Sequence, residues 1–275
     1  MSSIKTVNAA ETVYGEDSRR RLVQDPAEAY HEASKLFKQL GLRQTDAHLL
    51  QEDSNALIST TRSVKSWSQL TSLVLPPPAF SDIALGEILL RRRSQGSFAA
   101  KPITLTQLAT LVFAACGVTK RTPIAGGDEQ VFRTAPSGGA LYPLDLYVAV
   151  QRVDGLAPGL YYYNPLEHAL SVVQPKDVTD ALADACIYPQ AVQTSSATLV
   201  LSAMFWRSRF KYRLRAYRFT VLEAGHVAQN VLLAATSLGL GALPLGGFYD
   251  GAVDELLGVD GANEGVLYAV AVGAP

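Results

Sequence analysis

A cationic, aromatic-rich stretch holds the residues best suited to move a proton. The segment WRSRFKYRLRAYR, residues 206–218, has six cationic side chains and no acidic one. A lysine crowded by arginines has its charged form disfavoured, which lowers its pKa and makes it a better proton acceptor near neutral pH. We therefore expect Lys211, between Arg209 and Arg213, to be a general base, with the adjacent Tyr212 as a second proton-transfer group.

The same segment is also typical of a nucleic-acid-binding surface, because aromatic residues alternate with cations. The rest of the chain does not favour that function. Lys and Arg number 24 against 25 Asp and Glu in 275 residues, and no nucleic-acid-binding motif is present. We expect no nucleic-acid partner.

Two glycine pairs stand at places where a backbone could approach a ligand. Gly138–Gly139 follow Pro136–Ser137 and precede an apolar run, and Gly246–Gly247 follow the apolar residues 242–245. Glycine has no Cβ, so each pair permits close approach of a ligand or of another chain segment, or forms a simple turn. Neither pair lies in a GxGxxG motif, and GxxxxGK[ST] is absent, so neither a Rossmann dinucleotide site nor a P-loop is predicted.

The segment RRRS, residues 91–94, could bind a phosphate monoester. Arginine offers planar, bidentate donors and serine adds a hydroxyl. The alternative is a solvated cationic helix end, which the helix dipole favours.

Other kinds of site are not predicted. Cys116 and Cys186 have no partner spacing, and no HExxH, GxSxG or close cluster of His and acidic residues occurs, so we expect no metal site. The N-terminal segment shows no secretory signal and no apolar run is long enough to span a bilayer, so we expect a cytoplasmic protein with no membrane partner.

The pattern of elements indicates an α+β domain with one sheet covered by helices. The sequence LPPP, residues 75–78, reads as a stiff connector between an N-terminal extension (1–80), partly helical, and a main domain (81–275). We expect helices over 26–40, 81–93, 104–117 and 216–238, and strands over 144–151, 197–204 and 265–273 with a hairpin over 159–173.

Taken together, these fragments resemble the SagB-type dehydrogenases of the nitroreductase superfamily. Each fragment alone is weak, but their order along nearly the whole chain is specific. They are AYHEASKL (29–36), RRRS (91–94), APSGGALYPLDLYV (135–148), PGLYYYNP (158–165), FKYRLRAYRF (210–219), LEAGHVAQNVLLAATSLGLGALPLGGF (222–248) and LYAVAVGAP (267–275). The resemblance implies a nitroreductase-like fold with a central mixed or antiparallel sheet, and an FMN enzyme that oxidises thiazolines and oxazolines on peptides to thiazoles and oxazoles, with oxygen reoxidising the flavin.

The resemblance also assigns roles to residues. Lys211–Tyr212 match the family's proton-transfer pair. The FMN would be held by three groups: Arg92, Arg93 and Ser94 at the phosphate; Pro136, Ser137, Gly138 and Gly139 at the isoalloxazine, contributed by the neighbouring subunit of a homodimer; and Leu245, Gly246 and Gly247 at the reactive flavin nitrogen. The family often has a second basic residue at the place of Gly96, so another group would have to replace it here.

The implied partners are an azoline-containing peptide, a second copy of the chain, and a cyclodehydratase or a nonribosomal synthetase carrier. Whether the peptide is ribosomal or carrier-bound stays open. Two alternatives remain: an NAD(P)H-dependent nitroreductase, and a non-catalytic scaffold subunit of a cyclodehydratase complex. The Lys211–Tyr212 pair argues against the first, since hydride transfer from NAD(P)H needs no dedicated base of this kind.

Overall fold

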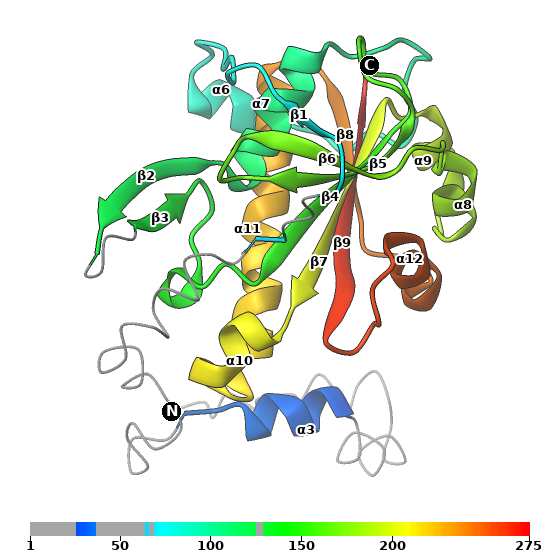
Figure 1. Ribbon diagram of the computed structural model, residues 1–275. Helices are drawn as coiled ribbons and strands as arrows, with labels where there is room; N and C mark the ends of the chain where they lie inside the picture. The colour runs from blue at the N-terminus through cyan, green and yellow to red at the C-terminus, as the bar shows by residue number, and fades with distance from the viewer. Residues whose placement is uncertain (1–25, 37–63, 66–68, 125–128) are drawn as a thin grey trace, which may run out of the picture.

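A seven-stranded antiparallel sheet forms the centre of the fold (Figure 1). The computed structural model describes residues 26–36, 64–65, 69–124 and 129–275. Every pairing in this sheet is antiparallel, which decides between the mixed and antiparallel arrangements and confirms the α+β class. In sheet order the strands are β1 (Ser72–Val74), β6 (Ala169–Gln174), β5 (Gly159–Asn164), β4 (Leu144–Val150), β7 (Ala197–Met204), β9 (Glu264–Gly273) and β8 (Gly241–Leu245).

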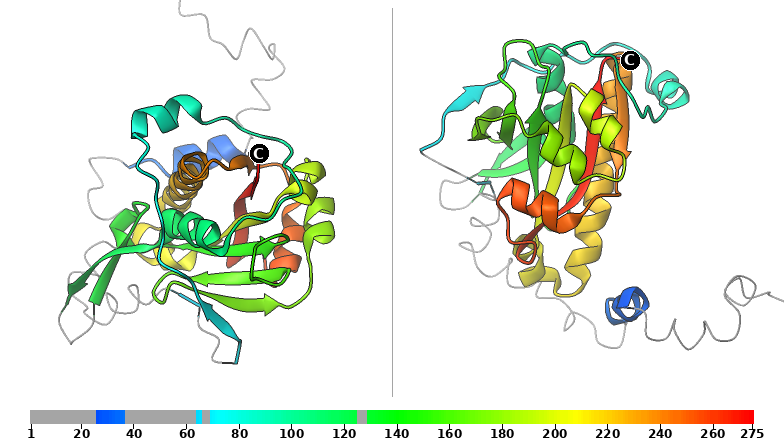
Figure 2. Two further views of the ribbon diagram at one scale, coloured as in Figure 1. Left: turned by 90° about the horizontal axis from the view of Figure 1, so that it is seen from above. Right: turned by 90° about the vertical axis from the view of Figure 1, so that its right-hand side faces the viewer.

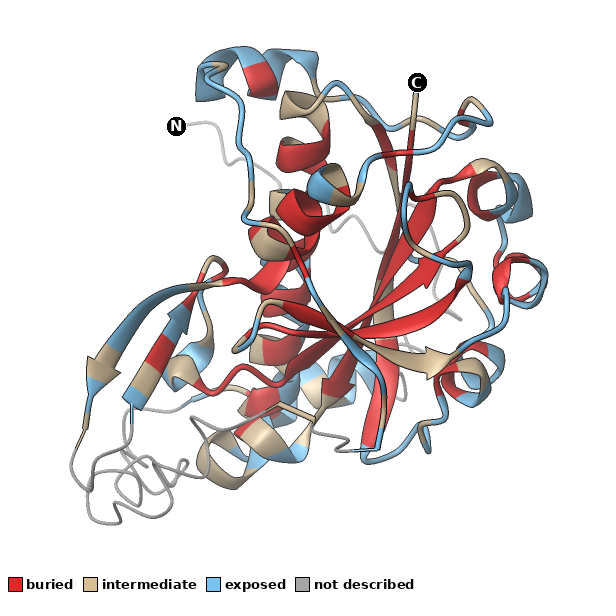
Figure 3. Cartoon of the chain, turned by 45° about the horizontal axis from the view of Figure 1, so that its top comes forward, coloured by how far each residue is buried: buried red, intermediate tan, exposed pale blue. Residues whose placement is uncertain are grey.

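The central strands are buried on both faces, as their sequences require. In β4, Leu146 and Val148 face one core while Tyr147 and Ala149 face the other, because successive strand residues alternate sides. The helices α7 (Leu105–Cys116) and α11 (Arg215–Ser237) cover the first face. The second face is covered by α8 (Thr179–Asp184), α9 (Pro189–Thr194) and α12 (Asp250–Leu257). The sheet therefore lies between two helical layers, and its central strands β5, β4 and β7 are almost wholly buried (Figures 2 and 3).

The two helices of the first layer have different local signals. A capping box starts α7: the Thr104 hydroxyl accepts from the Gln107 backbone N–H, and the Gln107 side chain accepts from the Thr104 N–H. The helix α11 is stabilised mainly by packing against α7 and the sheet. With 23 residues it is about 34 Å long, so its two ends lie in different parts of the molecule.

Several elements differ from the sequence prediction. The helix expected over 81–93 is only α6 (Leu85–Arg91), and the one expected from residue 26 is α3 (Pro26–Ala33), its predicted end lying outside the described residues. The segment 241–245 is a strand despite Pro244, which is tolerated because β8 is at the sheet edge. A hairpin of β2 (Val118–Pro123) and β3 (Glu129–Arg133) was not predicted.

Parts of the predicted extension join the main sheet. The strand β1 pairs with β6, and His168 bridges this region by hydrogen bonds to Tyr163 Oη (2.8 Å) and Pro76 O (2.9 Å). Lys65 forms a partly buried ion pair with Glu264 of β9. None of the helices in the described part of the chain is long and apolar enough to cross a membrane.

Candidate functional site

The predicted proton-transfer pair lies at a sharp corner between two helices. Lys211 and Tyr212 are the last residues of α10 (Trp206–Tyr212), and α11 begins three residues later. Arg213 makes the turn with a φ of 48°, a left-handed value that costs a non-glycine residue about 1–3 kcal/mol. Both side chains of the pair are partly buried, so the corner presents them in a fixed place.

The predicted loop of Pro136 to Gly139 lies directly against this pair. Gly139 has a φ of 65° and is the middle residue of a short 3₁₀ turn, η2 (Gly138–Ala140). A Cβ at Gly139 would lie 2.6 Å from Tyr212 Oη and 2.7 Å from Lys211 Nζ. Gly139 is therefore needed both for its backbone conformation and for the close approach of the two catalytic candidates.

Three contacts fix the corner. Arg207 donates to Asp145 of β4 across 2.9 Å in a buried ion pair, which ties α10 to the sheet. The rings of Tyr212 and Phe219 meet edge to face at 5.0 Å, and Lys211 Nζ lies 5.1 Å from the Tyr212 ring centre. The cations of 206–218 therefore do not form one surface, since Arg207 is bound within the protein.

A buried acid lies beneath the loop, and sequence reasoning missed it. Glu223 of α11 is only 4% exposed. Burial raises the pKa of Glu223 to about 7, against the opposing effects of a Ser137 hydrogen bond and the Arg133 charge. The Ser137 hydroxyl also accepts from the Tyr142 backbone N–H at 2.9 Å, and the Arg133 guanidinium stacks on the Tyr142 ring at 4.6 Å. The available signal was an acidic residue on the apolar face of a helix, four residues before Val227.

A groove of about 390 Å³ lies beside the second glycine pair. Gly246 and Tyr268 line one wall, and Val221, Ala224 and Gly225 of α11 line the other. A Cβ at Gly246 would meet nothing closer than the Tyr268 ring, at 3.7 Å, so the space in front of it is open. Leu245 is buried beneath the groove.

Gly247, the other member of the pair, packs away from open space. A Cβ at Gly247 would approach Ile187 to 3.1 Å. Its carbonyl accepts from the Ile187 backbone N–H at 2.9 Å, so Gly247 anchors the turn.

The predicted phosphate-binding residues lie at the start of β8. Ser94 is exposed and bridges Ala242, and Arg93 donates to the carbonyls of Leu90 and Arg92. The strand rise places Ser94 and Gly246 about 13 Å apart along this edge. The structure thus aligns two predicted cofactor-binding groups along β8.

The Pro136–Gly139 loop and the groove lie on opposite sides of α11. The loop contacts Phe219 and Glu223, whereas Val221 and Gly225 line the groove. Helical residues two positions apart point in nearly opposite directions, and a helix is about 10 Å wide. A ligand in the groove of one chain therefore cannot touch the Pro136–Gly139 loop of that chain.

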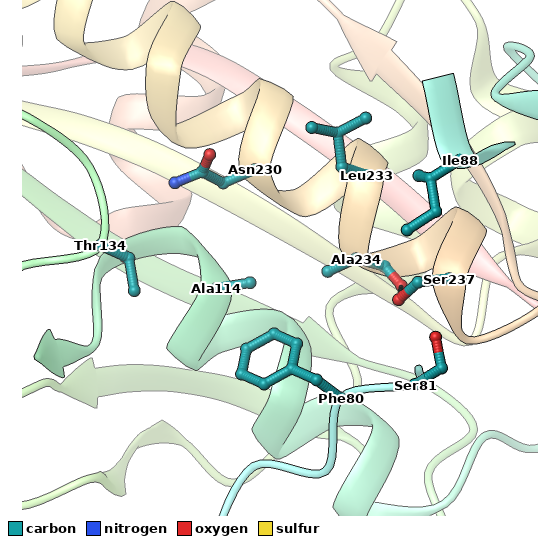
Figure 4. A pocket seen from close by; sticks show the side chains of 9 residues that line it. All are labelled: Phe80, Ser81, Ile88, Ala114, Thr134, Asn230, Leu233, Ala234 and Ser237. Carbon is teal, nitrogen blue, oxygen red and sulfur yellow. Dashed lines mark hydrogen bonds between the residues drawn. The ribbon is translucent and has the colours of Figure 1, made fainter. Parts of the chain in front are cut away.

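A further cavity, of about 270 Å³, lies between α6, α7 and the C-terminal half of α11 (Figure 4). Its wall is largely apolar, with Phe80, Ile88 and Leu233 as its large side chains and Asn230 as its amide. None of its lining residues in the described part of the chain is charged, and it lies far from Lys211 along α11. We do not assign it to catalysis.

Curated proteins from three organisms match the chain. A protein named as a nitroreductase in Methanocaldococcus jannaschii is 39% identical over 180 residues, 66% of this chain and 87% of its own length. The trifolitoxin-processing protein TfxB of Rhizobium leguminosarum bv. trifolii is 27% identical over 86% of this chain and 64% of its own length. The microcin B17-processing protein McbC of Escherichia coli is 31% identical over 48% of this chain and half of its own length.

Solved structures match the fold over most of the chain. A protein named as a nitroreductase from Anabaena variabilis gives a TM-score of 0.69 at 27% identity, covering 90% of this chain and 45% of that one. A chain of the E. coli microcin synthetase McbBCD complex, solved with truncated pro-MccB17 bound, gives a TM-score of 0.58 at 20% identity and covers 99% of both chains. The second likeness shows the fold alone.

The nitroreductase family model matches residues 89–274, which hold all the predicted site residues. The chain therefore belongs to the nitroreductase family, as the SagB-type motifs in its sequence predicted.

Proposed function

We propose that the chain is an FMN-dependent dehydrogenase that oxidises thiazoline or oxazoline rings on a peptide to thiazoles or oxazoles. The observation that carries this proposal is the Lys211–Tyr212 pair, held at a strained corner against Gly138–Gly139. Two relatives, TfxB and McbC, are named for processing trifolitoxin and microcin B17, which supports a peptide substrate.

The reaction requires the protein to accept a proton. Aromatising an azoline removes the Cα proton and a hydride from the adjacent ring carbon. Bound FMN would accept the hydride and pass the two electrons to molecular oxygen. Lys211 Nζ takes the Cα proton, and Tyr212 Oη, beside it at Gly139, orients the ring or relays the proton.

The residues along β8 fit FMN. Arg92, Arg93 and Ser94 offer the donors that a phosphate monoester takes. The open space before Gly246 admits a flat ring close to the backbone, where an N–H stabilises developing charge. Leu245 and Gly247 support this turn from behind.

The position of α11 supports a homodimer with shared sites. The helix separates the loop of Pro136 to Gly139 from the groove of its own chain, so a second copy would supply the loop. Tyr217, Val221 and Leu222 form an apolar stripe on the outer side of α11, with 46%, 45% and 56% of each residue exposed. Burying such a stripe favours association.

A second candidate function is that of an NAD(P)H-dependent nitroreductase, favoured by the identity to the M. jannaschii protein. In that case Lys211 would have no proton to accept. The third candidate is a scaffold within a synthetase complex, and a chain of the McbBCD complex shares the fold of this protein.

The visible spectrum of the purified protein separates these functions. We expect bound flavin that a thiazoline peptide bleaches under anaerobic conditions and air restores. Lys211→Ala should keep the flavin and lose bleaching by the peptide, whereas Lys120→Ala, on the exposed strand β2, should behave as the wild type.

Other outcomes point elsewhere. Bleaching by NADPH alone, in both the wild type and Lys211→Ala, would assign the chain to the nitroreductases in activity as well as in family. Bound flavin that neither reagent bleaches would favour the scaffold.

A further inference from the structure

The helix α3 of the N-terminal extension docks onto the catalytic corner. Tyr30 Oη donates to the Leu214 carbonyl at 3.0 Å and accepts from the Arg218 backbone N–H at 2.8 Å. The Arg218 side chain donates to the His31 carbonyl and to Ser34 Oγ. These contacts join α3 to the first turn of α11, directly after Lys211–Tyr212.

A cavity of about 230 Å³ remains between the two segments. Residues 33–36 of the extension form one wall and residues 212–215 form the other. We call it the α3 cavity. Tyr212, one of the two catalytic candidates, is part of its lining.

The lining of the α3 cavity is cationic. Among the described residues it contains Lys35, Arg213 and Arg215 and no acidic side chain, although Glu32 nearby pairs with Lys35. Arg215 Nη1 donates to the Ser34 carbonyl at 2.9 Å, but Arg215 Nε is buried and has no hydrogen-bond partner among the described residues. The unpaired N–H leaves part of the Arg215 charge without a counter-charge, which an anionic ligand in the cavity would supply.

The α3 cavity is linked to the catalytic pair through two ring contacts. The Arg215 guanidinium lies 5.7 Å from the Phe219 ring centre, and Phe219 packs edge to face on Tyr212. A group bound at Arg215 is therefore one side chain away from Tyr212. This spacing suits a residue near the reacting ring in the same peptide.

We propose that the α3 cavity binds a carboxylate of the peptide substrate, with Arg215 as its principal ligand. The extension would then form part of the substrate site and favour peptides with an acidic residue close to the azoline. This inference rests on the proposed function and names a feature of its substrate.

Binding can be tested without turnover. Fluorescein-labelled hexapeptides would carry a thiazole, which cannot be oxidised further, with either Glu or Gln beside it, before the ring in one pair and after it in another. Fluorescence anisotropy gives the Kd of each. We expect one pair to show Glu bound about 5- to 10-fold more tightly than Gln by the wild type, as a charged hydrogen bond at a partly exposed site gives.

Four variants make the test specific. Arg215→Gln should bind Glu and Gln peptides equally, and Arg215→Lys should keep part of the preference. Tyr30→Phe weakens the docking of α3 without changing the charge of the cavity. It should raise the Kd of both peptides and leave the ratio of the two Kd values unchanged. Lys120→Gln, on the exposed strand β2, should leave the binding of both peptides unchanged.

Two results would overturn the inference. One is equal binding of Glu and Gln peptides in both pairs by the wild type. The other is an equal loss of affinity for the Glu and Gln peptides in Arg215→Gln, which would show that Arg215 only holds α3 in place. Neither bears on whether the chain oxidises azolines, because a thiazoline peptide that bleaches the flavin would still establish that reaction.

Discussion

At the residue scale, Glu223 is a buried titratable group near the site, and its pKa lies close to neutral pH. Its carboxyl is buried under Ser137, and Arg133, Tyr142 and Cys116 are the titratable or charged groups that interact with it. Burial also raises the pKa of Cys116, to about 12, so this thiol stays protonated. Near neutral pH, Glu223 is therefore the group in this cluster that changes charge.

We expect Glu223 to make the stability of the protein pH-dependent. Its pKa in the folded chain is about 7, above the ordinary value of 4.5 that the unfolded chain has. Its stabilising contribution is therefore complete below about pH 4.5 and is lost as the pH rises through about 7. The free energy of unfolding of the wild type, relative to Glu223→Gln, should fall by up to about 3 kcal/mol between pH 5 and pH 8.

Urea unfolding at pH 5, 6, 7 and 8 measures this difference. Glu255→Gln, which removes an exposed carboxylate on α12, controls for the change in net charge. A difference between wild type and Glu223→Gln that is the same at each pH would mean that Glu223 is already ionised at pH 5.

At the element scale, the loop before β4 depends on a glycine for two separate reasons. Gly139 has a positive φ and also lies against Tyr212 Oη and Lys211 Nζ. Gly155 has a φ of 77° but has nothing within 4 Å of the place of its Cβ. A comparison of alanine variants at the two glycines therefore separates the effect of backbone strain from the effect of crowding at the site.

Gly139→Ala and Gly155→Ala should each lower the free energy of unfolding by about 1 kcal/mol, because both force alanine into a left-handed conformation. Only Gly139→Ala should lower activity, by about 10- to 100-fold, since it displaces the two flexible side-chain ends that carry the chemistry. Chemical unfolding and steady-state rates check the two effects. Equal activity in the two variants would remove the Gly139 contact from the mechanism.

Some elements could be predicted from the sequence because a local pattern determines them. The strands 144–150, 159–164, 197–204 and 264–273 are apolar on both faces, and the structure has them within one or two residues of their predicted bounds. The hairpin of β2 and β3 could not be found, since its charged strands lie outside the core.

The motifs that form the site could be predicted from the sequence, but their arrangement in space could not. The contact of Gly139 with Lys211–Tyr212, the burial of Glu223 and the docking of α3 all join segments that are distant in the chain. No local sequence pattern predicts contacts of this kind.

At the scale of the whole molecule, α11 decides which groups can act together. Lys211 precedes its first residue, and Ser94 bridges β8 beyond its last. The ring site at Gly246 lies instead beside the first turns of α11, on the side of the helix opposite to the Pro136–Gly139 loop that contacts Lys211. The width of α11 therefore separates a ring in this groove from the Lys211 of its own chain, and the proposed homodimer would present the Lys211 of the second copy.

Mixing two inactive variants tests this arrangement. Lys211→Ala removes the proposed base, and Ser94→Glu places a negative charge where the FMN phosphate would bind, at an exposed position that the fold tolerates. If the sites are shared, a mixed dimer has one site with both changes and one with neither. Random exchange makes half of the dimers mixed, so activity should return to about one quarter of the wild-type value.

A site built within one chain gives the opposite result. Every site then carries one of the two changes, and mixing restores nothing. Steady-state rates after unfolding and refolding the variants together measure the recovery, with each variant refolded alone as the control. Because recovery needs Lys211 from one copy and Ser94 from the other, it would test the proposed base, the proposed phosphate site and the shared dimer in a single measurement.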